Sequence, residues 1–458
     1  MKKSIEISKW WTWFSTIYFI IVAFLILHTP LLPLIMMLGY SIFCYFVYSV
    51  RHWRYFPVIF LMINNCMSTT TVLWLDYRKW FTILLVGMFI LDMCLLDKME
   101  IGCFFYNKYF IVFYFAALCI DILSKGTYTI FSLFFEFVSL AMVLYEISYK
   151  KQLDDFIDML IISTLCIALI GIYEFAIQDT FYYKRWTGEN RYRYGILRVG
   201  STVEDPNFMC FSMVPSLPLM AYKVSQGKNK FYYSILQVIF CGVILLTMSR
   251  IGLLTMLLGY FLIYFNKIQK VFQKNKALVL YIMFASGILA VGVLLLISSR
   301  LSFNMSDDSF SGRYYVYVSA LKIIFQNPIW GLGFEKFADA VEKILLKDYG
   351  MYNAIGFQNP MNTWLQVAVD GGLLMLIPFV MVFVTSIKIA INIYRRHTEY
   401  QYLIKMLAIS LIQWGIISFT LDGMENAIMW SMVLIPVMLK KVTNNSYVEE
   451  KEECKLVF

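Results

Sequence analysis

Charged residues are scarce in this sequence of 458 residues. Asp, Glu, Lys and Arg make up 15% of the chain, compared with roughly 25% in a soluble globular domain. Hydrophobic residues make up 60% of the chain and aromatic residues 18%. Apolar runs long enough to cross a bilayer as helices recur along the whole length. The composition excludes an ordinary soluble domain and predicts an all-α, polytopic transmembrane helical bundle.

Several catalytic and ligand-binding signatures are also absent. No Asp-x-Asp sequence occurs, which argues against a nucleotide-sugar and metal site, and no Walker-type phosphate loop occurs, which argues against ATP-driven activity. The nine cysteines lack metal-ligand spacing and lie mostly within apolar runs. Only three histidines are present. We therefore expect neither a metal nor another cofactor.

Fourteen apolar runs are candidate membrane spans, and because the shortest are marginal we expect about 12–14 spans. The runs cover residues 10–27, 31–50, 56–75, 80–96, 109–124, 128–148, 156–177, 207–222, 231–248, 251–266, 277–298, 362–386, 404–421 and 427–439. The predicted layout is N-terminal transmembrane helices (1–177), a basic outer loop (178–206), further transmembrane helices (207–298), a large outer loop (299–361), C-terminal transmembrane helices (362–439) and a cytoplasmic tail (440–458). The acid-rich residues 442–458 are predicted to be disordered.

The distribution of basic residues predicts the orientation. The formal net charge is +9, but the bases lie between apolar runs rather than on a soluble face, so we expect no nucleic-acid partner. When the N-terminus is placed in the cytoplasm, most of the Lys and Arg residues fall on the cytoplasmic side, as expected for inner-membrane proteins. Residues 10–27 then form an uncleaved first span. Both termini are predicted to be cytoplasmic, and the loops 178–206 and 299–361 to lie outside.

The first outer loop is rich in basic side chains. They are Lys184, Arg185, Arg191, Arg193 and Arg198. Tyrosine and tryptophan residues are interleaved with them. Guanidinium groups bind phosphate bidentately, and aromatic faces stack on sugars or lie at the membrane interface. Two interpretations remain open, namely an anionic-substrate site and a basic loop lying on lipid headgroups.

The same loop ends in Glu204-Asp205-Pro206-Asn207, directly before a predicted span. Asp-Pro-Asn is typical of a capped helix start. However, two carboxylates close to arginines at the membrane surface also stand where a general base is needed. Farther along, Arg250 interrupts two apolar runs, and it either reaches the membrane surface or points into a polar cavity.

The second outer loop contains two amphipathic segments. Ser311-Gly312-Arg313 can begin a helix, in which apolar residues recur at helical spacing. They are Tyr314, Val318, Leu321 and Phe325. A second segment covers 334–347. We expect both helices to lie flat on the outer leaflet and to form an ordered cap.

Carboxylates also fall within predicted spans. They include Asp92, Asp121, Glu136, Asp158 and Glu174. An intramembrane carboxylate is a functional candidate, so a proton relay and a hydrogen-bonded structural role both remain open.

Four stretches, taken in order, resemble the bacterial O-antigen polymerase and O-antigen ligase family. They are Glu204-Asp205-Pro206-Asn207; Thr247-Met248-Ser249-Arg250 with Ile251-Gly252-Leu253-Leu254; Ser311-Gly312-Arg313 with Asn327-Pro328 and Gly331-Leu332-Gly333; and Asn362-Thr363-Trp364-Leu365-Gln366 with Gly371-Gly372. The resemblance covers about the C-terminal 260 residues. Met361 stands where the ligases carry a histidine that is thought to activate the acceptor hydroxyl. This departure favours a polymerase.

The resemblance implies a metal-independent glycosyltransferase on the outer face of the cytoplasmic membrane. It would move a growing glycan from undecaprenyl diphosphate to a sugar hydroxyl of the next lipid-linked unit, by an inverting single displacement. Arg250 and Arg313 would stabilise the anionic leaving group, and Glu204 or Asp205 would accept the proton. The expected substrate-binding residues are Arg185, Arg191, Arg193, Arg198, Asn207, Tyr314 and Asn362. The product would be O-antigen, capsule or exopolysaccharide.

Three alternatives remain open. An O-antigen ligase-type transferase would share the fold. A lipid-linked oligosaccharide flippase or transporter would also be polytopic, although transporters often contain repeated halves and none is evident here. A non-enzymatic scaffold would leave the outer arginines unexplained. Expected partners are lipid-linked glycans, membrane lipids, and a flippase and chain-length regulator of the same pathway.

Overall fold

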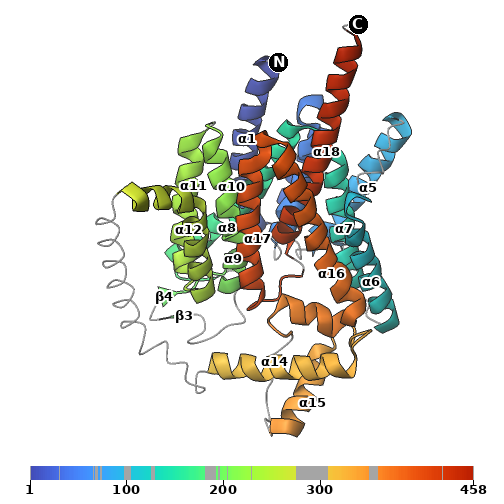
Figure 1. Ribbon diagram of the computed structural model, residues 1–458, viewed down its shortest axis with the longest axis vertical. Helices are drawn as coiled ribbons and strands as arrows, with labels where there is room; N and C mark the ends of the chain where they lie inside the picture. Colours follow the sequence, from blue (N-terminus) through green and yellow to red (C-terminus); the bar gives the residue numbers. More distant parts are fainter. Residues whose placement is uncertain are drawn as a thin grey trace.

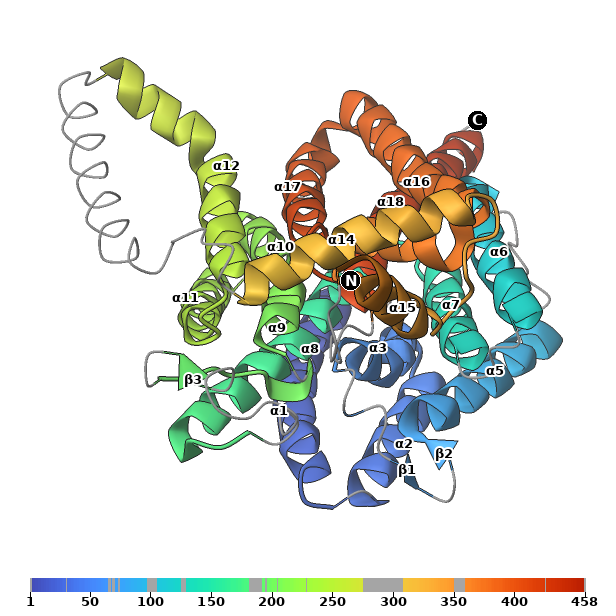
Figure 2. The same cartoon turned by 90° about the horizontal axis from the view of Figure 1, so that it is seen from below.

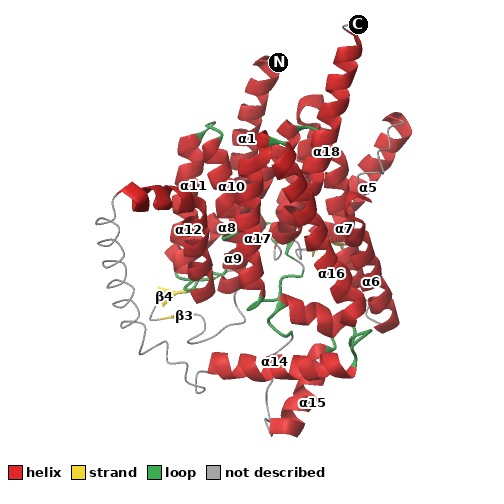
Figure 3. Ribbon diagram, viewed as in Figure 1, coloured by secondary structure: helices red, strands yellow, loops and turns green. Residues whose placement is uncertain are grey.

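The computed structural model describes the chain except for a set of short segments and one longer one. These are residues 1, 30, 65–66, 68–70, 73–74, 97–104, 125–128, 181–191, 194–195, 204, 228, 275–307, 350–358, 425 and 457–458. Almost all of the described part is helical (Figure 3). Two short antiparallel hairpins, β1–β2 (Thr71–Val72, Leu75–Asp76) and β3–β4 (Tyr192–Arg193, Ile196–Leu197), are the strands that it contains. The predicted all-α class is confirmed.

The helices follow the predicted spans closely. They are α1 (Lys2–Ile26), α2 (Leu31–Phe46), η1 (Tyr48–Tyr55), α3 (Phe56–Ile63), α5 (Tyr77–Leu96), α6 (Lys108–Ser124), α7 (Thr129–Glu146), α8 (Lys150–Ile177), η4 (Ser201–Val203), α9 (Pro206–Met213), α10 (Ser216–Ser225), α11 (Lys230–Leu246), α12 (Arg250–Lys274), α14 (Asp308–Gln326), α15 (Phe337–Tyr349), α16 (Thr363–Arg396), η5 (Thr398–Tyr400), α17 (Gln401–Ser418) and α18 (Ala427–Leu456). The predicted span 277–298 lies outside the described residues.

Several of these helices can cross a bilayer by themselves. In the described part of the chain, five are both long and apolar enough; they cover Phe105–Ser124, Lys150–Ile177, Arg250–Lys270, Thr363–Arg396 and Thr398–Ser418. Three shorter apolar helices cover Trp10–Ile26, Leu31–Phe46 and Lys230–Leu246. The protein is thus an all-α polytopic membrane protein, and the total of 12–14 spans stays a prediction.

The helices stand side by side, and the two ends of the bundle differ (Figure 1). Both chain termini lie at one end, here called the terminal end. The helix α14 runs across the opposite end, and α15 lies beyond it; this is the cap end (Figures 1 and 2). Both helices are present where the amphipathic pattern predicts them. They pack on each other and on α16 through an apolar cluster: Val316, Ala320, Ile323, Phe337, Val341, Leu345 and Val369.

The helix α8 forms the centre of the bundle. Of its most apolar 18-residue window, 83% is buried, as expected for a helix that is hydrophobic on all sides. The outer helices instead expose large apolar side chains such as Phe115, Val238 and Ile377. These exposed side chains are the surface that a bilayer would cover.

Ion pairs fill the interior near the terminal end. Arg54 is fully buried and contacts Asp92 at 2.5 Å and Glu146 at 3.0 Å. Lys223 contacts Asp158 at 2.8 Å. Two of the predicted intramembrane carboxylates are therefore neutralised by bases, which favours their structural interpretation.

The other three carboxylates differ in their surroundings. The carboxylate of Glu174 accepts a hydrogen bond from the amide of Ser201 at 2.8 Å, which again favours a structural role. Asp121 is buried on α6. The side chain of Glu136 lies outside the described residues.

Two segments depart from the sequence-based prediction. The helix α3 ends after Ile63, in the middle of the predicted span 56–75, where the Asn64 backbone leaves the helical conformation (φ −96°, ψ 64°). The side-chain NH₂ group of Asn64 donates to the carbonyls of Phe60 and Ser163 (3.0 and 3.1 Å). The predicted disorder of 442–458 was wrong, since α18 continues as one helix to Leu456.

Candidate functional site

The first predicted motif begins the helix α9 at the cap end. The Asp205 carboxylate accepts hydrogen bonds from the amides of Asn207 (2.6 Å) and Phe208 (3.3 Å), and Pro206 occupies the first turn. This is N-cap geometry. Burial raises the pKa of Asp205, while the amide bonds and the charge of Arg198 oppose that rise. The predicted cap is confirmed, and the predicted role of Asp205 as a base stays a prediction.

The second motif contacts the first through side chains. The Ser249 hydroxyl donates to the Asn207 side-chain oxygen at 2.9 Å. The Arg198 guanidinium donates to the carbonyl of Thr247 at 3.2 Å. Arg250 begins α12 next to this junction and is exposed. The fold therefore brings together residues from 198, 205–207 and 247–250 at one place.

The third motif lies over the loop that joins α17 to α18. Arg313 is half-buried on α14, and Tyr317 lies one turn farther along the same face. Burial raises the pKa of Tyr317, and the nearby Arg313 charge opposes that rise. The Tyr317 hydroxyl donates to the carbonyl of Phe419 at 2.8 Å. Arg313 is thus held next to the start of this loop.

The fourth motif begins α16 beside the same loop. The Asn362 side-chain oxygen caps the helix by accepting from the amides of Trp364 and Leu365, and its NH₂ group donates to the Phe419 carbonyl at 3.3 Å. The predicted substrate-binding role of Asn362 stays a prediction, because these contacts already give the side chain a structural task.

The glycines of the third and fourth motifs fasten the cap to the bundle. Gly372 has φ 58° and kinks α16. A Cβ atom there would lie 2.4 Å from the Ile329 carbonyl oxygen, a contact that only glycine permits. On either side of the kink, the amides of Leu332 and Leu373 donate to the carbonyls of Val369 and Pro328 (2.7 and 2.8 Å). The Gly331-Leu332-Gly333 turn therefore has a structural role.

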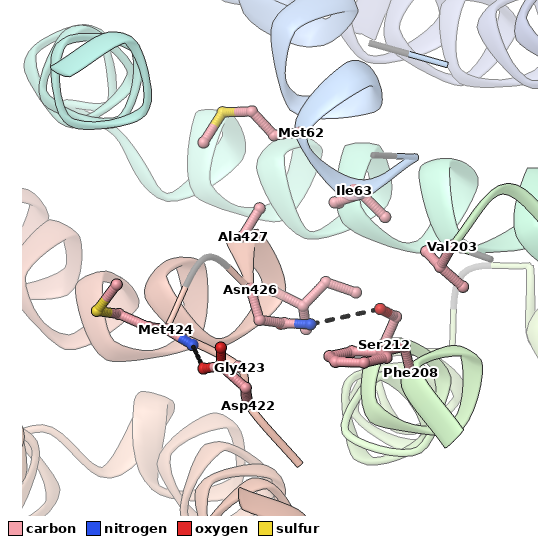
Figure 4. Close-up of a pocket in the computed structure, with 11 residues that line it drawn as sticks. Met62, Ile63, Val203, Phe208, Ser212, Asp422, Gly423, Met424, Asn426 and Ala427 are labelled. Carbon is pink, nitrogen blue, oxygen red and sulfur yellow. Dashed lines mark hydrogen bonds between the residues drawn. The ribbon is translucent and has the colours of Figure 1, made fainter. Parts of the chain in front are cut away.

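A cavity of about 200 Å³ opens beside α9 (Figure 4). Apolar side chains from α3, η4, α9 and α18 form much of its wall, and Ser212, Asp422 and Asn426 contribute polar groups. Asn426 donates to the Ser212 hydroxyl at 3.4 Å, and the amide of Met424 donates to Asp422 at 3.4 Å. The cavity borders the Asp205–Asn207 segment through Phe208.

The remaining predicted site residues are less fully defined. Arg185, Arg191 and Glu204 lie outside the described residues. Arg193 lies in β3, but its side chain is not among those described. Tyr314 is on α14, 53% exposed, with its ring against Tyr315. The binding roles of these residues stay predictions.

Sequence reasoning missed the α17–α18 loop. Asp422 and Asn426 fall in the short gap between the predicted spans 404–421 and 427–439, which looks like an ordinary turn. The signal that could have marked it is the density of polar and turn-forming residues in a gap flanked by apolar runs. Asn64, inside the predicted span 56–75, was missed in the same way.

Fold and site together define a polytopic membrane protein with an arginine-containing polar site at the cap end. Residues 235–380 match the model of a family described as O-antigen ligase. This match confirms the resemblance: the segment is similar to the O-antigen ligase/polymerase-like family, whose members are glycosyltransferase-like enzymes acting on lipid-linked glycans. The matched range includes Arg250, Arg313, Met361 and Asn362. No curated protein matches the chain.

Proposed function

We propose that this chain is a polymerase that joins undecaprenyl-diphosphate-linked oligosaccharide repeat units into a surface polysaccharide. The observation that carries the proposal is the presence of three arginines at the cap end. Arg198 and Arg250 lie at the junction with α9, and Arg313 lies on α14 beside the α17–α18 loop. The reaction releases a lipid diphosphate, and preorganised guanidinium groups stabilise the charge that develops as the sugar C1–O bond breaks.

Met361 favours polymerisation over ligation. A thioether cannot take up a proton near neutral pH, so this position cannot perform the acid–base role implied for the histidine of the ligases. In the structure Met361 has φ 49°. Its backbone amide donates to the side-chain oxygen of Asn359 at 3.0 Å, and its carbonyl accepts from the Tyr317 hydroxyl at 3.3 Å. The main chain here holds the start of α16 in place.

The cellular test uses a strain that lacks this chain. Lipid-linked single repeat units should accumulate on the outer leaflet, and polymer should be lost. The wild-type chain should restore polymer, whereas Arg250→Ala or Arg313→Ala should not. Arg396→Ala, an exposed arginine at the opposite end of α16, is the matched control and should restore polymer. Accumulation on the inner leaflet would support the flippase alternative instead.

The proposal also requires the cap end to face outward. After the native cysteines are replaced by serine, Lys343→Cys on the exposed surface of α15 should react with an impermeant maleimide in intact cells. Arg396→Cys at the terminal end should react only after permeabilisation. The reverse labelling pattern would exclude a polymerase that acts on the outer face. It would also contradict the predicted cytoplasmic location of both termini.

A further inference from the structure

The cavity next to α9 lies beside the junction that contains Arg198 and Arg250. Asn207 and Phe208 are consecutive residues in the first turn of α9, and their side chains contact different parts of the site. Asn207 accepts from Ser249, next to Arg250, whereas Phe208 lines the cavity. One turn of helix is about 5.4 Å long, so a ligand in the cavity lies within reach of a group bound by the arginines.

The cavity has the composition of a carbohydrate subsite. Met62, Ile63 and Phe208 supply apolar surface, and Ser212, Asp422 and Asn426 supply hydrogen-bonding groups. The C–H faces of a sugar ring can pack on the apolar side chains, and its hydroxyl groups can bond to the polar ones. The volume of about 200 Å³ is below the roughly 300–1,000 Å³ of pockets for drug-sized ligands. It therefore suits one ring rather than a whole repeat unit.

Asp422 is held rigidly at the wall of this cavity. The Thr363 hydroxyl donates to the Leu421 carbonyl at 2.8 Å and accepts from the Gly423 amide at 2.9 Å, so it fixes the residues on both sides of Asp422. Gly423 lies so close to α9 that a Cβ atom would be 1.9 Å from the ring of Phe211. A functional carboxylate needs such support to keep its geometry.

The two described carboxylates near the arginines have different tasks. Asp205 Oδ1 accepts from two amides and caps α9, so proton transfer to it would weaken the start of the helix. Asp422 lines the cavity, and its Oδ1 accepts from the Met424 amide at 3.4 Å. Because Asp422 forms part of the cavity wall, it is the carboxylate placed to meet a hydroxyl of a sugar bound there.

We propose that the cavity binds the acceptor sugar of the incoming lipid-linked repeat unit and that Asp422 accepts the proton of its attacking hydroxyl. The acceptor oxygen forms the new bond to C1 of the donor sugar as the C1–O bond to the diphosphate breaks. The bonding electrons leave with the lipid diphosphate, and the hydroxyl proton moves to the Asp422 carboxylate. The proposal rests on the proposed polymerase function.

The test measures elongation by the purified full-length chain in lipid vesicles, with lipid-linked repeat unit extracted from a strain lacking the chain. General-base catalysis typically contributes about 100- to 10,000-fold, so Asp422→Asn should slow elongation at least about 100-fold. Asp422→Glu should recover part of the rate. Asp348→Asn on α15, at an exposed ion pair with Lys322 away from the cavity, is the matched control and should elongate normally.

Other outcomes separate the two proposals. In one outcome the wild-type chain and Asp422→Asn both elongate repeat units, whereas Arg250→Ala does not. The proposed acceptor site is then wrong, and the proposed polymerase function stands. If the wild-type chain never elongates repeat units, the polymerase function itself fails. If Asp422→Asn does not fold, Ala427→Val is tested instead, because it narrows the cavity and keeps the Asp422 carboxylate. It should raise the KM for the repeat unit about 10-fold, and an unchanged KM would overturn the proposal.

Discussion

The terminal end and the cap end of the bundle both contain arginines, but in opposite settings. At the terminal end Arg54 is fully buried and contacts two carboxylates, Asp92 and Glu146. At the cap end Arg250 is exposed and Arg313 is half-buried. Removing charges from water is unfavourable unless opposite charges compensate them, so the first arrangement is structural. Solvent-accessible arginines at the mouth of a polar site can instead bind an anion from outside.

The largest effect on stability is expected at the terminal end. Arg54→Met removes a buried base that contacts the buried Asp92 and the half-buried Glu146. Breaking a buried ion pair typically costs about 3–5 kcal/mol. We expect a markedly lower thermal midpoint and less protein in the membrane, with activity falling in parallel with the amount of folded protein. Thermal unfolding in lipid nanodiscs measures this change. Normal stability would show that the network is not structural.

The cap-end arginines should affect catalysis without affecting folding. Arg250→Ala and Arg313→Ala should each reduce elongation by roughly 100- to 1,000-fold, as the loss of one preorganised charge stabiliser does. Arg→Lys should recover little, because an ammonium group cannot make the bidentate contact. Rates are compared at equal amounts of folded protein. An alanine variant that elongates normally contradicts the assignment of that arginine.

The attachment of the cap should show an intermediate effect. Gly372→Ala forces a side chain into a left-handed backbone conformation and against the carbonyl oxygen of Ile329. A strained backbone position of this kind costs about 1–3 kcal/mol. We expect faster proteolysis of the cap region while the remaining helices stay protected. Gly39→Ala, which has open space around it, is the control and should behave like the wild-type chain.

The smallest effect is expected at Met361. If this residue contributes only packing or substrate contact, Met361→Ala should lower the elongation rate by less than about tenfold, within the roughly 1 kcal/mol typical of most substitutions. Chain-length distributions at matched protein levels provide the measurement. A complete loss of polymer would show that position 361 takes part directly in the reaction.

Much of the fold could be predicted from the sequence because its signals are local. Apolar runs located the described spans, and helical periodicity located α14 and α15. The end of α3 could not be predicted, because it depends on Asn64 bonding to the distant carbonyl of Ser163. The single helix α18 was missed because its acidic, polar end resembles a disordered tail.

The candidate site was predicted only in part. The ordered motifs predicted a functional centre that includes Asp205, Asn207 and Arg250. In the structure Ser249, directly before Arg250, donates to the Asn207 side chain. The sequence left open whether Asp205 caps a helix or acts as a base, and the structure shows that its carboxylate caps α9. The sequence could not place Asp422 beside α9, because that proximity arises from segments more than 200 residues apart. Long-range contacts of this kind leave no local pattern.

The most direct test of the difference between the two ends is elongation by the purified chain. Vesicles containing the wild-type chain and purified lipid-linked repeat unit should yield a ladder of lengthening lipid-linked glycans. Arg250→Ala should leave the repeat unit unchanged, and Arg396→Ala at the terminal end should give the full ladder. If the wild-type chain instead transfers finished glycan to a non-repeat acceptor and never extends a repeat unit, the polymerase account is contradicted.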